Sequence, residues 1–109
     1  MLKGVGKDEP VITNSKGGKQ SKSSYAFHLI DTGALLAMAE RLQFGQDKGY
    51  ARDNWRLIDS EEHFNHMLIH YFAAIAGDDS DDHLAGFICR AMMCYATAKA
   101  EQANSFQID

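Results

Sequence analysis

The 109-residue sequence has no run of eighteen apolar residues, and its first ten residues, MLKGVGKDEP, contain no apolar stretch. The first absence excludes a membrane span, and the second excludes a secretory signal peptide. The chain has only two cysteines, Cys89 and Cys94. Their spacing of five places them on different faces of a helix, so we expect free thiols in a cytoplasmic protein.

The sequence also lacks an excess of basic residues. Eleven Lys and Arg stand against fifteen Asp and Glu, for a net charge of −4, which argues against a general binder of nucleic acid polymers. The charge is unevenly distributed, because residues 1–25 carry five Lys and only Asp8 and Glu9 as acids. Residues 26–109 have a net charge of −7. An acidic body is therefore preceded by a basic leader.

The leader is rich in Gly, Ser and Lys and holds the only proline, Pro10. We predict a flexible basic leader at residues 1–24 and a helical domain at residues 25–109. The stretch GGKQSKSSY at 17–25 has two interpretations. Its composition is that of a flexible tail, whereas its glycines and lysines suit a loop that closes over a phosphate.

Apolar residues at helical spacing predict three main helices after the leader. The first covers about 33–44 and ends at Gly45. The second is capped by Ser60, carries Glu61 and Glu62 in its first turn and ends at Gly77. The third is capped by Ser80 and runs from Asp81 to about Gln102. The predicted fold is an all-α small helical bundle.

Two helical patterns suggest how the bundle packs. The second helix has an apolar stripe that we expect to form its core face: Phe64, Met67, Leu68, Tyr71, Phe72 and Ile75. The third helix is apolar almost all round, which calls for burial on more than one side. In so small a domain the second side is most easily covered by another subunit, so we predict a homo-oligomer.

Histidines form the densest cluster of reactive side chains. His63, His66 and His70 fall within about 60° of one another on the second helix, at the edge of the apolar stripe. An antiparallel hairpin of helices two and three would place His70 opposite Arg90 and His83 opposite Ala76. His66 and His70 would then suit one metal ion, with His83 about 9 Å further along. Alternatively, His66, His70 and Arg90 would bind an anion, or the histidines are structural.

The acidic tract Asp78, Asp79, Asp81 and Asp82 invites a comparison with metal-binding motifs. An EF-hand is excluded, because the sixth loop position is not Gly and the twelfth would be Cys89. The paired ExxE and ExxD carboxylates of all-α nucleotide pyrophosphohydrolases are also absent. These acids therefore serve either as helix caps or as ligands of a divalent cation.

Several motifs occur in a characteristic order: GGKQSKSSYAFHLID, a helix, a loop ending in DNW, then HxxxH, AGD and DHL. In this order they resemble the N-terminal domain of bacteriophage dATP/dGTP diphosphohydrolases, over about residues 16–97. The resemblance implies a phage protein of the host cell cytoplasm that handles nucleotides. It also implies that pyrophosphohydrolase chemistry belongs to a separate MazG-like part, which these residues lack. Family-like positions are Gly18, Lys19, Gln20, Ser21, Gly45, Lys48, Tyr50, Asn54, Trp55, His66, His70, Gly77, Asp78, Asp82 and His83.

Two features depart from the family pattern. The loop between Gly45 and Trp55 is one residue longer, and Gly86 stands where a second histidine often follows His83 by three residues. We therefore favour capture of a purine nucleotide, or of a cyclic nucleotide used in bacterial immune signalling. The first alternative is a dATP/dGTP pyrophosphohydrolase that depends on Mg²⁺ or Mn²⁺. The second is a helical oligomer with no small ligand.

These hypotheses assign two sets of residues. The expected ligand-binding residues are Lys19, Gln20, Ser21, Lys22, Tyr25, Tyr50, Asn54, Trp55, His66, His70 and Arg90. The expected metal ligands are His66, His70, Asp78, Asp82 and His83. The first set combines cations for phosphate with aromatic rings for a base.

Overall fold

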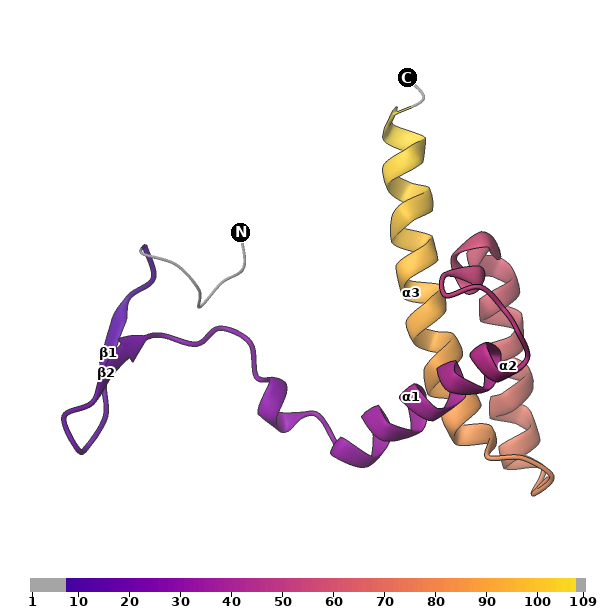
Figure 1. Cartoon of the computed structure of the whole chain (residues 1–109), viewed down its shortest axis with the longest axis horizontal. Coiled ribbons are helices and arrows are strands. Elements are labelled where there is room, and N and C mark those ends of the chain that lie inside the picture. The colour runs from indigo at the N-terminus through magenta and orange to yellow at the C-terminus, as the bar shows by residue number, and fades with distance from the viewer. Residues whose placement is uncertain (1–7, 108–109) are drawn as a thin grey trace. The chain divides into compact units, whose positions relative to one another are not determined.

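The computed structural model describes residues 8–107, with side chains from 8 to 104. The chain divides into two compact units, residues 1–31 and 32–109. Three helices dominate the second unit, and a two-stranded sheet lies in the first (Figure 1). The predicted helical fold with three main helices is confirmed, and the sheet is an addition to it.

The first unit contains an antiparallel hairpin of β1 (Val11–Thr13) and β2 (Lys19–Ser21), which pairs Val11 with Ser21. The side-chain oxygen of Asn14 accepts the backbone N–H groups of Lys16 and Gly18, each at 2.9 Å. Gly17 has a φ of +85°, which a glycine adopts without strain. Turn chemistry therefore organises a segment that composition alone marks as a tail. A short 3₁₀ helix, η1 (Phe27–Leu29), follows.

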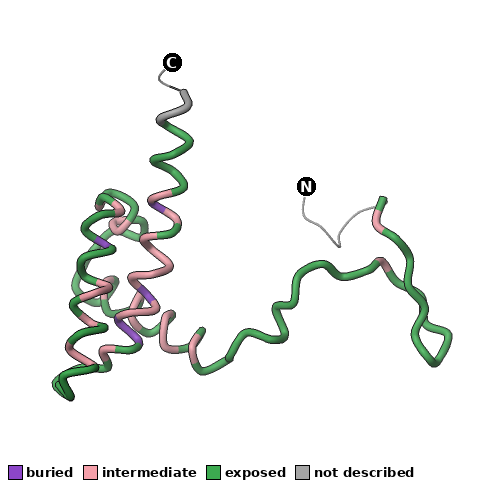
Figure 2. The backbone as a smooth tube through the Cα atoms, turned by 180° about the vertical axis from the view of Figure 1, so that it is seen from behind, coloured by how far each residue is buried: buried purple, intermediate pink, exposed green. Residues whose placement is uncertain are grey.

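The second unit holds α1 (Thr32–Asp47), the 3₁₀ helix η2 (Asn54–Leu57), α2 (Ser60–Ile75) and α3 (His83–Gln107). The largest packing interface is between α2 and α3, and both α1 and η2 also pack on α3. Buried positions lie on α2 and α3, whereas much of the remaining surface is exposed (Figure 2). None of the helices in residues 8–107 has the length and apolar composition needed to cross a membrane.

The ends of the helices correct three predictions. The first helix continues through Gly45 to Asp47, and Gly49 supplies the left-handed residue that ends it, with a φ of +86°. Asp59, not Ser60, is the N-cap of α2. Asp82, not Ser80, caps α3, because its Oδ1 accepts the N–H of Ala85 at 3.1 Å. The predicted end of α2 at Gly77 is confirmed, with a φ of +80°.

The core face of α2 is also different from the predicted one. The buried residue of α2 is His63, whereas Phe64, Tyr71, Phe72 and Ile75 are exposed. On α3 the buried side chains include Ala85, Cys89 and Thr97. Helix α2 therefore docks through the edge that carries His63 and His70, while His66 stays exposed. Both cysteines are free, as predicted, and burial raises the pKa of the Cys89 thiol.

Candidate functional site

A cleft of about 770 Å³ opens in the second unit. Its walls are the C-terminal half of α1, the loop from Lys48 to Ile58 with η2, and one face of α3, and His70 of α2 also lines it. Small-molecule sites are typically about 300–1,000 Å³. The cleft is therefore of a size that accepts a nucleotide.

Positive charge is concentrated in this cleft. Five of the six Lys and Arg residues between 26 and 109 line it, whereas only two of the thirteen acids in that range do. The five cations are Arg41, Lys48, Arg52, Arg56 and Arg90. The two acids, Asp53 and Asp81, pair with Arg56 and Arg41. Among the described residues, Lys48, Arg52 and Arg90 have no carboxylate within ion-pair distance.

A buried histidine holds one wall of the cleft together. The Nε2–H of His63 donates to the carbonyl oxygen of Trp55 at 2.8 Å, which leaves Nδ1 to accept from Nη1 of Arg90 at 3.0 Å. Burial, opposed by the Trp55 carbonyl and reinforced by the Arg90 charge, lowers the pKa of His63. The neutral ring thus connects η2 to α3. Burial also lowers the pKa of Arg90, which remains a cation.

Trp55 is partly buried, and its ring faces are not both available. The guanidinium carbon of Arg56 lies 4.2 Å from the centre of the indole ring, and the His63 ring meets it edge-on. Tyr50 also lines the cleft and is 52% exposed. Tyr50 is therefore the more accessible aromatic surface for a base.

A second histidine contact lies where α2 meets the start of α3. Nδ1 of His70 is 3.0 Å from Nδ1 of His83, and Nε2 of His83 contacts a carboxylate oxygen of Asp78. The ring of His70 lies against Gly86, where an added Cβ would be 2.6 Å from Nε2. Because Gly86 has no side chain, the imidazole of His70 can lie directly on α3. It then reaches His83, which lies one helical turn before Gly86.

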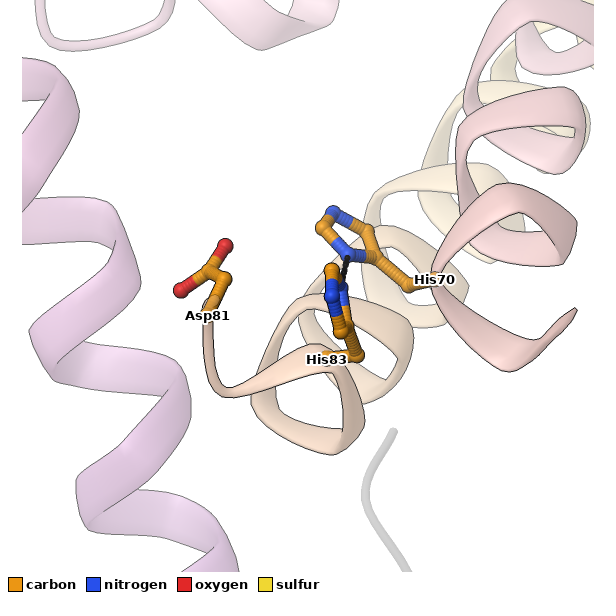
Figure 3. Close-up of side chains that lie close together, drawn as sticks. All are labelled: His70, Asp81 and His83. Atoms are coloured by element: carbon orange, nitrogen blue, oxygen red, sulfur yellow. Dashed lines mark hydrogen bonds between the residues drawn. The ribbon is translucent and has the colours of Figure 1, made fainter. Parts of the chain in front are cut away.

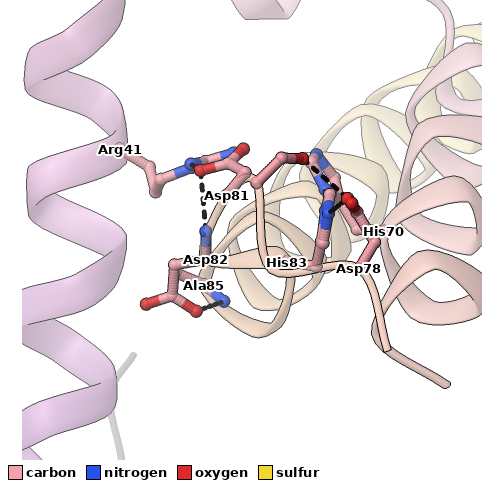
Figure 4. A network of polar contacts seen from close by, with 8 residues as sticks. Arg41, His70, Asp78, Asp81, Asp82, His83 and Ala85 are labelled. Carbon is pink, nitrogen blue, oxygen red and sulfur yellow. Dashed lines mark hydrogen bonds and ion pairs between the residues drawn. The ribbon is translucent and has the colours of Figure 1, made fainter. Parts of the chain in front are cut away.

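The loop before α3 is held by a polar network (Figure 4). The guanidinium of Arg41 on α1 donates hydrogen bonds to both carboxylate oxygens of Asp81. The distances are 2.7 Å from Nη1 to Oδ1 and 3.1 Å from Nη2 to Oδ2. This contact lowers the pKa of Asp81 and raises that of Arg41. The hydroxyl of Ser80 donates to Asp78 at 2.7 Å and, together with His83, lowers the pKa of Asp78.

These contacts correct the predicted alignment of the hairpin. Arg90 contacts His63 rather than lying opposite His70, and His83 contacts His70 rather than lying opposite Ala76. The cause is the irregular segment 76–82, which delays the start of α3 from the predicted Asp81 to His83. The predicted 9 Å gap between His70 and His83 is therefore absent.

The structure brings together some of the predicted site residues. Tyr50, Asn54, Trp55, His70 and Arg90 line the cleft. Lys19, Gln20, Ser21, Lys22 and Tyr25 belong to the first unit, so their role in binding stays a prediction. His66 is exposed and lies outside both the cleft lining and the potential metal cluster, which consists of His70, Asp81 and His83. Asp78 contacts His83, and Asp82 caps α3.

His63, Arg41 and Asp81 belong to this region but are in neither set of expected site residues, although Asp81 lies in the acidic tract that was considered for a divalent cation. His63 had a usable signal, since it shares the stripe of His66 and His70. The pairing of Arg41 with Asp81 spans 40 residues and had no local signal.

A known protein family covers the part of the chain that forms the cleft. Residues 14–105 match the model of the family described as dATP/dGTP diphosphohydrolase, N-terminal. The chain belongs to this family. The match includes the second strand of the hairpin and all three helices through position 105, so it covers the whole cleft lining. No curated protein and no solved structure matches the chain significantly.

Proposed function

We propose that the chain captures a phosphate-bearing purine nucleotide or cyclic nucleotide in the cleft. The observation that supports this most strongly is the collection of five of the body's six cations around one opening, on a body that is otherwise acidic. Membership of a family named for dATP and dGTP points to the same class of ligand. If the protein comes from a phage, capture of a cyclic nucleotide would counteract bacterial immune signalling.

Arg90 is the centre of the proposed phosphate site. It is partly buried, lines the cleft and bonds to a neutral imidazole rather than to a carboxylate. A cation removed from water is costly unless an anion compensates it, and a guanidinium offers paired N–H donors to phosphate. Lys48 and Arg52 at the exposed side of the cleft would add further contacts, and Tyr50 would stack on the base.

The leading test identifies what the protein retains. Purified protein is incubated with dATP, dGTP and a panel of cyclic nucleotides, with and without Mn²⁺ or Mg²⁺, then heat-denatured, and the released compounds are analysed by mass spectrometry. We expect intact ligand in stoichiometric amount. Metal-dependent release of monophosphate would instead establish the pyrophosphohydrolase alternative. Retention of no nucleotide would favour the helical oligomer without a ligand.

The chain offers a matched set of variants for the charge argument. Lys48→Ala combined with Arg52→Ala should weaken nucleotide binding at least about tenfold, because one lost charge-assisted contact costs roughly 1.5–3 kcal/mol and about 1.4 kcal/mol corresponds to a factor of ten. The effect should shrink as salt rises. Lys99→Ala removes the one cation of the body outside the cleft and should leave affinity unchanged in the same calorimetric titration.

A loss of affinity in Lys99→Ala that is as large per charge removed as in the double variant would show that only net charge matters. That outcome would contradict a phosphate site in the cleft.

A further inference from the structure

We propose that His70, His83 and Asp81 form a binding site for a first-row divalent transition metal ion such as Zn²⁺ or Mn²⁺. One ligand atom of each residue lies within 4.8 Å of the others. Figure 3 shows the two imidazole rings meeting from α2 and α3, with the Asp81 carboxylate beside them on the preceding loop. Two imidazoles and one carboxylate are a donor set that such ions accept.

The spacing of the two nitrogens fits a shared ion. Metal–nitrogen bonds of about 2.0–2.1 Å place two ligand nitrogens about 2.9 Å apart at a right angle and about 3.3 Å apart at a tetrahedral angle. The two Nδ1 atoms are 3.0 Å apart. The imidazoles thus already stand at the separation that binding one ion requires.

The tautomer of His83 leaves one ring nitrogen available as a metal ligand. Nε2 of His83 faces the Asp78 carboxylate and carries a proton, so Nδ1 is the nitrogen that offers a lone pair toward His70. Nδ1 of His70 either donates its proton to that lone pair or, in the other neutral tautomer, binds the same metal ion. A carboxylate on the outer N–H of a ligating histidine is the usual support of a metal site, and Asp78 provides it here.

Two further contacts hold the ligands in place. Gly86 leaves room for the His70 ring against α3, and Arg41 fixes the Asp81 carboxylate through both oxygens. Oδ1 of Asp81 also accepts the backbone N–H of Asp82 at 2.8 Å, whereas Oδ2 accepts, among the described residues, only from Arg41 and keeps a second lone pair for an ion, reached by a small side-chain rotation or through a bound water. The nitrogen ligands disfavour Mg²⁺, which prefers oxygen donors.

The site differs from the sequence prediction, which paired His66 with His70. His66 is exposed and takes no part in the cluster. Because His70 and Asp81 also line the cleft, an ion held here would face its interior. The metal site itself stands independently of whether a nucleotide binds.

The experiment uses the full chain and metal ions alone, without nucleotide. Calorimetric titration with Zn²⁺ and visible spectroscopy with Co²⁺ should show one ion per chain. His70→Ala and His83→Ala should each weaken binding at least tenfold, and Asp78→Asn should weaken it about 10- to 100-fold through loss of the supporting carboxylate. His66→Ala, on the same helix but outside the cluster, should leave binding unchanged.

A second measurement avoids any dependence on how the variants fold. Substoichiometric Mn²⁺ added to the wild-type protein should broaden the imidazole NMR signals of His70 and His83 before those of His66 or His28. No stoichiometric binding, broadening centred on His66, or equal loss of affinity in His66→Ala would overturn the site.

Discussion

At the scale of single residues, His63 shows how a polar ring comes to occupy a core. Its side chain is fully buried, yet both ring nitrogens have partners, one from η2 and one from α3. Burial of a polar group is tolerable only when its hydrogen bonds are satisfied. The ring therefore fixes the Trp55 segment and the Arg90 guanidinium at once, and both belong to the cleft.

This environment predicts a pH dependence of stability. The pKa of His63 is lowered in the folded state, so the unfolded chain takes up a proton first as pH falls below the ordinary value of 6.5. The free energy of unfolding should be constant above this pH with respect to His63 and should decrease below it, by at most about 1.4 kcal/mol per pH unit for one proton. Urea unfolding between pH 5 and 8 measures the slope.

His70 contributes to the same slope, because burial and the nearby Arg41 charge also lower its pKa. His63→Gln keeps one donor and one acceptor and should reduce the slope to the part that His70 contributes. His66→Gln, at an exposed position, should leave it unchanged. A slope that is undiminished in His63→Gln would show that His63 does not titrate as its surroundings require.

At the scale of elements, Gly45 and Gly77 are both predicted to end a helix, but only Gly77 does so. Gly77 follows α2 with a φ of +80°, and the N–H groups of Gly77 and Asp78 bond back to Ala74 and Ala73 at 3.1 and 3.0 Å. This is a Schellman motif, which requires a left-handed residue. Gly45 lies inside α1, where the corresponding motif is displaced to Gly49.

Alanine substitution should distinguish the two glycines. Gly77→Ala should lower the free energy of unfolding by about 1–2 kcal/mol, because a side chain is strained at positive φ. Gly45→Ala should be neutral or stabilising by up to about 1 kcal/mol, because alanine favours a helix interior. The added Cβ would lie an ordinary 3.4 Å from the Tyr50 ring. Chemical denaturation measures both, and a larger loss in Gly45→Ala would contradict this assignment.

At the scale of the whole second unit, both helices of the α2–α3 hairpin carry exposed apolar side chains, which we call the apolar surface. It consists of Phe64, Tyr71, Phe72, Ile75, Leu84 and Tyr95, each exposed by 43% or more. The rings of Tyr71 on α2 and Phe87 on α3 are 5.7 Å apart and connect the two halves of this surface. Clusters of exposed apolar side chains are typical of interaction surfaces.

We expect this surface to mediate the predicted homo-oligomer. Ile75→Glu, at a position that is 64% exposed, should dissociate the assembly, because a charge would be buried in the interface. Leu57→Glu, on η2 and 84% exposed, is the matched control and should leave the molar mass unchanged. Light scattering during size-exclusion chromatography measures both. A monomeric wild-type protein, or equal dissociation by both variants, would contradict this interface.

The sequence by itself determined the three helices, the end of α2 at Gly77, the free cysteines and the family. These features depend on local patterns, namely apolar spacing, a glycine after the last turn, and motifs in a fixed order. It also marked Tyr50, Trp55, His70 and Arg90, which the structure places around one cleft.

Only the tertiary structure decided which face of α2 meets α3 and which histidines meet one another. The apolar stripe predicted a core around Phe72, but the paired hydrogen bonds of His63 and the space above Gly86 favour docking through the histidine edge. The length of the irregular segment 76–82 sets the register of α3, which brings His83 to His70. Such choices depend on contacts between distant residues, and no local pattern encodes them.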